Sequence, residues 1–408
     1  MDEKLVPKRR FVGFTDNWEC INISELAEVR TGKAFSSSEF KKDGEYLVVT
    51  NKNVQDELKG LESSGDKINI SKKTILHNYL LNGQNVLVTM DGVNIGKTGK
   101  FSNGKAVLAQ RVGRLTSNQL EFVYQITQNI KFENWMNRIS IGNAIKHISL
   151  KQISEYSFFS PISGDEQQRI GEFFANLDGL IASQQRKLNK TKAMKSAYLS
   201  EMFPADGESK PKRRFSGFTD DWEQGTIGDF GSFHYGKSAP KWSVTQDATT
   251  PCVRYGELYT KYNEKIDTIY SFTNIPKDNL RFSTGKEVLV PRVGEDPLDF
   301  ANCSWISIPG VAIGEMISVY NTKQNPLFTA YMFNTLLKKE FAKRVEGGNV
   351  SNLYYTYLEN ISVSYPSIEE QEKISSFFDS LSNNIASQQQ KLDKLKDMKK
   401  AYLNEMFI

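Results

Sequence analysis

The sequence predicts two mixed α/β domains joined by two long helices, and three observations lead to that fold class. Residues 166–203 return as residues 370–407 at an offset of 204, with 23 of 38 positions identical. A shorter segment, residues 7–19, returns at the same offset as residues 211–223 with 11 identities in 13. The stretches between these repeats have nearly equal length but little identity. Because an internal repeat outranks local signals, the chain is expected to hold two copies of one unit.

The repeated long segments are predicted to be helices with one narrow apolar seam. In the second copy the seam runs through Leu381, Ile385, Gln388, Leu392, Leu395, Met398, Tyr402 and Met406, and in the first through Leu177, Ile181, Gln184, Leu188, Met194, Tyr198 and Met202. Apart from one step of six between Leu188 and Met194, these are steps of three and four, which place the seam on one face of a helix roughly 57 Å long. A narrow seam of that length favours an intramolecular coiled coil between the two copies. The alternative is two separate surface helices, each packed on its own domain.

The stretches between the repeats, here called the variable bodies, show matching landmarks. Each has two predicted strands, at 45–50 and 83–88 in the first body and at 250–255 and 285–290 in the second, followed by helical spacing at 120–135 and 327–341. A last strand leads to Pro161 or Pro366. The predicted boundaries are 1–17 for the N-terminal repeat segment, 18–160 for the first body, 161–205 for the central helix, 206–221 for the linker and second repeat segment, 222–366 for the second body and 367–408 for the C-terminal helix.

Composition restricts the class of protein. A chain of 408 residues suits two or three domains, and no apolar run approaches the length needed to span a bilayer. Three scattered cysteines, Cys20, Cys252 and Cys303, suit a reducing cytoplasm, and the three histidines form no metal-ligand pattern with them. The net charge is only +4, but Arg186, Lys187, Lys190, Lys192 and Lys195 form a basic run without an acid. This run is either a solvated helix face or a surface for an anionic partner.

The sequence carries none of the common catalytic motifs. Residues 92–98, GVNIGKT, have three residues between their glycines where a phosphate-binding loop needs four, and they lead to a further turn rather than a helix. We therefore expect an ordinary loop there. The sequence has no G-x-S-x-G elbow, H-E-x-x-H pair, paired-cysteine site or Asn-Pro-Pro-aromatic motif. The chain alone is expected to be non-catalytic and to bind no metal.

Taken together, the duplicated frame resembles the specificity (S) subunits of Type I restriction-modification systems. The resemblance covers essentially the whole chain and rests on two variable bodies within near-identical repeats. Further support comes from helices that open as Glu-Gln-Gln-Arg-Ile at 166–170 and Glu-Gln-Glu-Lys-Ile at 370–374. Thr-Gly-Lys at 31–33 fits the start of a target-recognition domain, and Tyr-Gly-Lys at 235–237 fits less well.

This resemblance implies a DNA-binding role in host defence. Each body would be a target-recognition domain reading half of a split double-stranded DNA site, and the helices would form an antiparallel coiled coil that fixes the spacer. Two modification subunits would dock on the frame and bring S-adenosylmethionine and adenine methylation. Restriction subunits would add cleavage with ATP and Mg²⁺, whereas this chain would bind no cofactor.

Candidate DNA contacts are polar residues in loops that follow the predicted strands. Asn, Gln and Arg suit base edges and Lys suits phosphate, although any of them can instead be a solvated loop residue. In the first body they are Lys33, Thr50, Asn51, Lys52, Asp91, Asn94, Lys97, Gln110, Arg111, Asn143 and Lys146; in the second they are Lys237, Arg254, Tyr255, Glu257, Arg292, Glu295, Asn349 and Ser351.

Two other classes of function are alternatives to DNA recognition. A self-contained nucleic-acid enzyme needs catalytic motifs that the sequence lacks. A coiled-coil adaptor that binds only protein leaves unexplained why two bodies diverge inside one nearly identical frame. Methylation or ATPase activity of the isolated chain would favour the first, and lack of sequence-selective DNA binding would favour the second.

Overall fold

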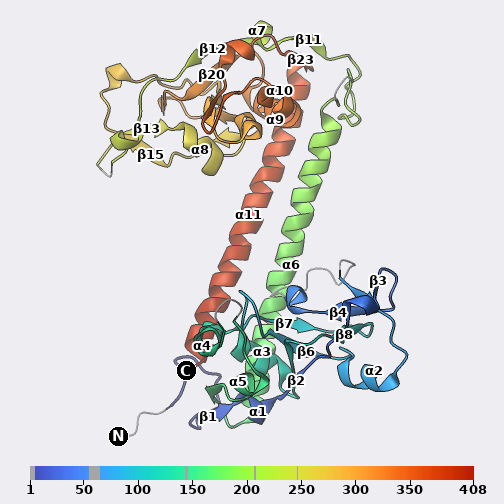
Figure 1. The fold of residues 1–408 in the computed structure, drawn as a ribbon. Coiled ribbons are helices and arrows are strands. Elements are labelled where there is room, and N and C mark those ends of the chain that lie inside the picture. The colour runs from blue at the N-terminus through green and yellow to red at the C-terminus, as the bar shows by residue number, and fades with distance from the viewer. Residues whose placement is uncertain (1–4, 55–64, 143–145, 206–207, 246) are drawn as a thin grey trace. The chain divides into compact units, whose positions relative to one another are not determined.

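The computed structural model describes residues 5–54, 65–142, 146–205, 208–245 and 247–408. The chain divides into two compact units, residues 1–187 with 388–408 and residues 188–387. Each unit contains one variable body and part of each of the two long helices (Figure 1). Within the described residues, no helix is both long and apolar enough to cross a membrane.

The first body is built on two four-stranded sheets. Strand β6 is central in one of them, and all five of its residues are buried, as expected for a strand covered on both faces. One sheet has the order β2 (Glu28–Thr31), β9 (Val112–Thr116), β6 (Asn85–Thr89) and β7 (Thr98–Phe101), all antiparallel; the other has the order β3 (Phe40–Lys41), β5 (Lys67–Ile68), β4 (Tyr46–Val49) and β8 (Ala106–Leu108), with β4 and β8 parallel.

Short helices complete the first body, and most of them pack with β6 in its main core. They are α1 (Ile23–Leu26), α2 (Lys73–Tyr79), α3 (Leu120–Gln128), α4 (Ile130–Ile139) and α5 (Leu150–Ser154). The core joins β6 and α3 to Phe174 of the long helix and to Phe407 near the C-terminus. The body is therefore packed onto both long helices of its own unit.

The second body repeats this plan with more strands. Its largest sheet has the order β12 (Gly231–Tyr235), β20 (Ile317–Thr322), β16 (Glu287–Pro291), β18 (Ser304–Ile306) and β14 (Lys265–Ile266). Two smaller sheets contain β15 (Ser271–Thr273), β13 (Thr250–Val253) and β19 (Ala312–Ile313), and β17 (Val293–Gly294), β22 (Ser351–Asn352) and β21 (Glu346–Gly347). The helices are α7 (Ile227–Phe230), α8 (Tyr255–Thr260), α9 (Pro326–Leu336) and α10 (Lys338–Ala342).

The predicted helical stretches at 120–135 and 327–341 are each two helices. Asn129 ends α3 and its side chain accepts a hydrogen bond from the Lys131 backbone, which starts α4. Leu337 likewise separates α9 from α10. The spacing of apolar residues continues across both breaks, so the periodicity alone did not reveal the Asn129 cap.

Each body is closed where it meets its long helix. Strand β1 (Glu19–Asn22) pairs with β10 (Ser157–Ser160), and β11 (Glu223–Thr226) pairs with β23 (Ser362–Tyr365), both antiparallel. The first and last strands of each body therefore lie side by side. This is the arrangement expected of a module inserted into a repeated frame.

The N-terminal repeat segments are anchored to the long helices by matching ion pairs. Arg10 Nε donates to Glu166 Oε1 at 2.7 Å, and Arg214 Nη2 donates to Glu370 Oε2 at 2.6 Å. The Glu166 and Glu370 side chains are 1% and 0% exposed. Trp18 and Trp222 are also buried. The near-identity of these segments therefore has a structural cause, because both copies make the same buried contacts.

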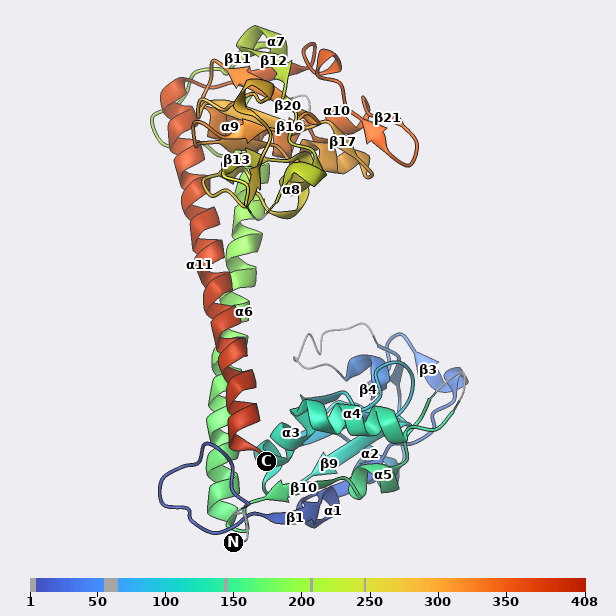
Figure 2. The same ribbon diagram turned by 90° about the vertical axis from the view of Figure 1, so that its left-hand side faces the viewer.

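The two long helices, α6 (Gly164–Met202) and α11 (Ile368–Met406), pack antiparallel within each unit (Figure 2). In the first unit Phe174 contacts Phe407, with ring centroids 5.9 Å apart, and Asp178 pairs with Lys399 at 2.6 Å. In the second unit Tyr198 contacts Phe377 at 5.2 Å. The predicted helix pair is confirmed, with both helices starting two residues before the repeated segments.

The seam differs from the predicted one at two positions. Leu177, Ile181, Leu188, Leu381, Gln388 and Leu392 are buried, and Gln184 and Ile385 are half-buried. Met194 and Met398, however, are 41% and 42% exposed. The neighbouring lysines turn inward instead: Lys195 pairs with Glu264 at 2.9 Å and Lys399 with Asp178, each beside a tyrosine ring of its body. The bodies cover that side of each helix, which the helix sequence alone does not reveal.

Candidate nucleic-acid interface

The loops of the first body that carry predicted DNA contacts meet at one edge of its sheets. Strands β4 and β8 are parallel, so the loops that follow them emerge at the same edge. The Lys33 backbone joins them: its N–H donates to the Leu108 carbonyl at 3.0 Å, and its carbonyl accepts from the Gln110 N–H at 2.9 Å. Lys33, Thr50 and Gln110 are therefore brought together from three separate segments.

Asp91, two residues beyond the end of β6, links two further predicted residues. Its carboxylate accepts a hydrogen bond from the Asn51 side-chain amide and pairs with Arg111 Nη1 at 3.2 Å. Arg111 has φ of 65°, a left-handed conformation that is uncommon for a residue with a side chain. The Met90 N–H donates to the Arg111 carbonyl at 3.3 Å. Asn51, Asp91 and Arg111 thus form one connected polar cluster, in which the Arg111 side chain is 64% exposed.

The other predicted residues of the first body lie around this cluster. The Gly92 N–H donates to the Lys146 carbonyl at 3.1 Å, which brings the 90s loop against the segment that leads to Ile148. Lys52, Asn94, Lys97 and Lys146 are exposed. Asn143 lies outside the described residues. Residues 92–97 contain no helix and lead into β7, which confirms the predicted loop.

The second body brings its loops together in the same way. The Lys237 N–H donates to the Ile313 carbonyl at 2.8 Å, and the Gly314 N–H donates to the Val253 carbonyl at 2.9 Å. Arg254 and Tyr255, at the start of α8, therefore lie near the loop that follows β19. Lys237, Glu295 and Asn349 are exposed, whereas Arg254, Tyr255 and Arg292 are half-buried.

Two predicted residues of the second body have internal roles. Glu257 is 9% exposed, and its carboxylate accepts from the Arg254 N–H at 2.9 Å and from Ser271 Oγ at 2.5 Å. Ser351 is 4% exposed and its hydroxyl donates to the Gly348 carbonyl. Both side chains hold loops in place, and we do not include them among the residues proposed to touch DNA.

Sequence reasoning missed the aromatic residues around Arg292. The guanidinium carbon of Arg292 lies 4.5 Å from the ring centroid of Tyr235 and 5.4 Å from that of Tyr354. Tyr235 also contacts Tyr355 at 4.6 Å. These tyrosines belong to segments far apart in the sequence, and no spacing pattern connects them to Arg292. The clustering of tyrosines at 354, 355 and 357 was the one available signal.

In each body the loops that carry the predicted DNA contacts form one face. Equivalent backbone hydrogen bonds hold these two faces, although their side chains differ. The Met90 N–H donates to the Arg111 carbonyl, and the Arg292 N–H donates to the Met316 carbonyl at 3.1 Å. On the other side, the Ile148 and Leu353 N–H groups donate to the Met90 and Arg292 carbonyls, each at 2.8 Å. The same scaffold thus presents two different sets of side chains.

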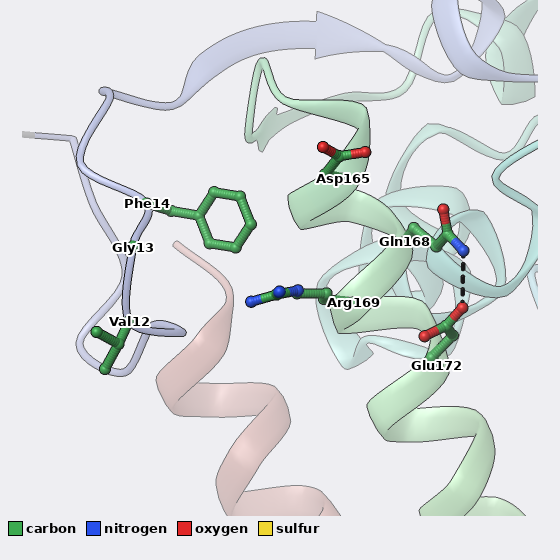
Figure 3. A pocket seen from close by; sticks show the side chains of 7 residues that line it. All are labelled: Val12, Gly13, Phe14, Asp165, Gln168, Arg169 and Glu172. Atoms are coloured by element: carbon green, nitrogen blue, oxygen red, sulfur yellow. Dashed lines mark hydrogen bonds between the residues drawn. The ribbon is translucent and has the colours of Figure 1, made fainter.

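A different surface lies on the repeated frame, and its aromatic–cation contact occurs in both copies. A hollow lies between the loop Val12–Phe14 and the start of α6, lined by Asp165, Gln168, Arg169 and Glu172 (Figure 3). Arg169 lies over the Phe14 ring at 5.5 Å, and in the second copy Lys373 lies over Phe218 at 4.7 Å. Val12 at the tip of the loop is 96% exposed. This surface belongs to the frame, not to the variable bodies.

The groups with the largest pKa shifts lie in the cores rather than on these faces. Burial raises the pKa of the Cys252 thiol to about 11 and that of the Tyr156 phenol to about 12. Burial also raises the pKa of the Cys303 thiol well above its usual value. Such groups stay neutral at physiological pH and serve packing. Among the described residues, no group of three or more His, Cys, Asp or Glu is arranged to hold a metal ion.

Comparison with known proteins identifies the family. A specificity subunit of the MjaVIII Type I restriction enzyme of Methanocaldococcus jannaschii is 22% identical over 415 residues, covering 95% of this chain and 92% of the relative. The crystal structure of the Type I system S subunit from M. genitalium matches with a TM-score of 0.67 at 15% identity, covering 99% of both chains.

A chain from a structural study of complex assembly and conformational transition in a type I system matches with a TM-score of 0.50 at 12% identity, covering 95% of this chain and 97% of the other. At such identities these structures establish the fold. The Type I restriction modification DNA specificity domain matches twice, over residues 15–193 and 219–397, and each match includes one variable body and most of a long helix. With more than half of its length matched in this way, the chain belongs to the family of Type I restriction-modification DNA specificity proteins.

Proposed function

We propose that each variable body reads one half of a bipartite double-stranded DNA site, while the helix pair sets the unread gap. The observation that carries this proposal is the pair of faces held by equivalent backbone hydrogen bonds but carrying different polar side chains. A scaffold duplicated for stability alone would have no reason to vary these positions. Two different readers on one frame suit a site with two different halves.

The chemistry of the faces supports a division between phosphate and base contacts. The exposed amines of Lys52, Lys97 and Lys146 suit phosphate oxygens, which supply affinity without sequence information. Asn51, Arg111 and Arg292 carry side chains that can donate to the edges of bases in the major groove. Asp91 and the tyrosines restrict the motion of these readers, so less entropy is lost on binding.

The repeated frame supports a partner present in two copies. The Phe14–Arg169 and Phe218–Lys373 surfaces are built from matching segments, and two equivalent surfaces suit two identical modification subunits. These subunits would supply S-adenosylmethionine-dependent adenine methylation, and restriction subunits would supply ATP- and Mg²⁺-dependent cleavage. The present chain contributes recognition and holds no catalytic residue in this scheme.

Exchange of one body tests the proposal. Glu19 lies opposite Ser160 in the pairing of β1 with β10, so residues 18–160 begin and end at adjacent points of the frame. A chimera that takes residues 18–160 from a relative should be co-expressed with the modification subunits, and methylated adenines should then be mapped in the host genome. We expect only one half of the methylated sequence to change.

The reciprocal exchange of residues 222–366 is the matched control and should change only the other half. If either exchange alters both halves, or if the motif follows the modification subunits rather than this chain, the bodies are not independent readers.

A further inference from the structure

Arg292 is held in place more firmly than an ordinary loop arginine. It directly follows β16, and its guanidinium carbon lies 4.5 Å from the ring centroid of Tyr235 and 5.4 Å from that of Tyr354. Stacking against aromatic faces suits arginine because its charge is delocalised over a plane and is weakly hydrated. Tyr235 ends β12, and Tyr354 precedes the 3-10 turn Tyr355–Tyr357. Two separate segments therefore restrict the side chain.

The Arg292 backbone is fixed as well. Its N–H donates to the Met316 carbonyl at 3.1 Å and its carbonyl accepts from the Leu353 N–H at 2.8 Å. The next two residues form β17 and pair with β22. Because main chain and side chain are both held before any partner binds, little conformational entropy remains to be lost on contact.

The charge of Arg292 is not neutralised by an ion pair among the described residues. The salt bridges of the described second body involve other basic side chains, such as Arg344 with Glu340. Arg292 Nε is buried without a hydrogen-bond partner. The two terminal nitrogens are then the donors left for an acceptor that lies outside the chain.

We infer that Arg292 determines specificity by reading a guanine in the half-site of the second body, with its two terminal nitrogens donating to guanine O6 and N7. Guanine presents two adjacent acceptors in the major groove, and the fork of arginine matches them. This inference rests on the proposed function and deepens it. A phosphate contact would use the same charge, but it would not need a guanidinium plane fixed by two rings.

The first body offers a matched comparison at the equivalent backbone position. There Met90 replaces Arg292, and Arg111 replaces Met316 on the other side of the same hydrogen bond. The arginine and the methionine have exchanged strands. Arg111 therefore supplies a control on the same scaffold that lies in the other body.

The first experiment maps methylated motifs made by the complex of this chain with its modification subunits. The variants are Arg292→Lys and Arg292→Ala, with Arg111→Lys and the ion-paired Arg344→Lys as controls. We expect the wild-type motif to contain a guanine at one fixed position of the second half-site. Arg292→Ala should relax discrimination at that position alone by roughly 10- to 100-fold. Arg111→Lys should leave that position unchanged, and Arg344→Lys should leave the whole motif unchanged.

The second experiment removes the acceptor instead of the donor. A synthetic duplex carrying 7-deazaguanine at the relaxed position lacks N7, so the wild-type complex should bind it more weakly than the guanine duplex. The complex with Arg292→Ala should bind both duplexes equally. Continued discrimination by that variant would show that another residue reads the guanine.

The variant Tyr354→Leu is a control for misfolding of the Arg292 variants. It keeps the arginine but removes one of the two rings beside it. This variant should keep the motif and lose part of the discrimination at the same position. A second half-site without a guanine, or a uniform fall in methylation at every motif, would overturn the assignment of Arg292 to a base. The proposed function would still stand in either case if the methylated motif is bipartite and depends on this chain. If the wild-type motif does not depend on this chain, the proposed function and the role of Arg292 are both wrong.

Discussion

At the scale of single residues, the buried ion pair between Arg214 and Glu370 should be essential for stability. Glu370 accepts two hydrogen bonds from Arg214, at 2.8 and 2.6 Å, and its side chain is fully buried. Arg214→Met leaves a carboxylate without a partner in the interior, which costs about 3–5 kcal/mol. We therefore expect a clear fall in the denaturant midpoint of unfolding, followed by circular dichroism.

The exposed pair Lys210–Asp221 supplies the control for this prediction. Its side chains are 53% and 73% exposed, so Lys210→Met should change stability by no more than about 1 kcal/mol. The double variant Arg214→Met/Glu370→Met should recover much of the loss because it removes the unpaired charge. If Arg214→Met and Lys210→Met lower the unfolding midpoint equally, the buried pair contributes no more to stability than the exposed pair.

His234 should make the second body sensitive to mild acid. Burial lowers the pKa of His234, and the nearby Arg281 charge lowers it further. Its Nδ1 lies 2.9 Å from the Asn321 amide nitrogen, from which a neutral ring can accept. The unfolded chain takes up a proton near pH 6.5 while the folded histidine resists it, so this contribution to stability is present above that pH and is lost as the pH falls.

Unfolding midpoints between pH 7.5 and pH 5 check this sign. His234→Gln should flatten the acid side of the curve, whereas replacement of the exposed His77 by Gln should not. Identical slopes for wild type and His234→Gln would contradict the prediction.

Also at the residue scale, the candidate site was only partly accessible from the sequence. Polar residues after strands led to Asn51, Asp91 and Arg111, which lie together in one cluster because strand ends place loops at sheet edges. The same rule also selected Glu257, whose carboxylate caps its own helix. The rule did not select Tyr235 or Tyr354, because their contact with Arg292 depends on which loops meet in the folded protein.

At the scale of elements, the glutamines of the seam should cost stability. Gln388 is 3% exposed, and the Gln184 amide donates to the Gln388 backbone carbonyl at 3.2 Å. A buried polar residue in a coiled coil fixes register at the expense of stability. Replacing both glutamines by Leu should therefore raise the melting temperature and loosen the choice of register, measured by calorimetry and by disulfide trapping between α6 and α11.

The exposed methionines of the same helices provide the control. Met194→Gln with Met398→Gln makes the reverse change outside the seam, and Met and Gln have similar helix propensity, so little change is expected. A less stable Leu variant that keeps one register would show that the glutamines stabilise the pair.

Elements were predicted best where repetition and periodicity agreed. Both long helices and the strands β4, β6, β13 and β16 fall where the sequence placed them. The inward-facing Lys195 and Lys399 were not predicted, because Glu264, Asp178 and the tyrosine rings beside them decide which helix face is covered. Periodicity describes a helix in isolation, and these residues respond to neighbours distant in sequence.

At the scale of the whole molecule, the length of α6 and α11 should determine the unread gap of the DNA site. Each helix has 39 residues without a break, and a straight helix gains about 1.5 Å per residue. Two half-sites on one face of a duplex lie about 34 Å apart, one helical turn. If the helices act as the ruler, lengthening both must change the gap and leave both halves of the motif unchanged.

Paired insertions test the ruler. Seven residues that continue the heptad, placed after Leu188 and after Leu392, preserve the seam and add ~10 Å to each helix, or about three base pairs. Both leucines are 1% exposed, so the seam is well packed where each insertion begins. Mapping of methylated adenines should then reveal the original two half-sites separated by a longer gap.

Insertions that break the heptad separate this effect from general damage. Four residues in α6 alone rotate its seam relative to α11 and should impair folding instead of changing the gap. An unchanged gap in a folded, active complex with the paired seven-residue insertions would mean that the modification subunits or DNA bending set the spacing. The helices would then serve to hold two readers on one chain, and the gap would be a property of the assembled complex.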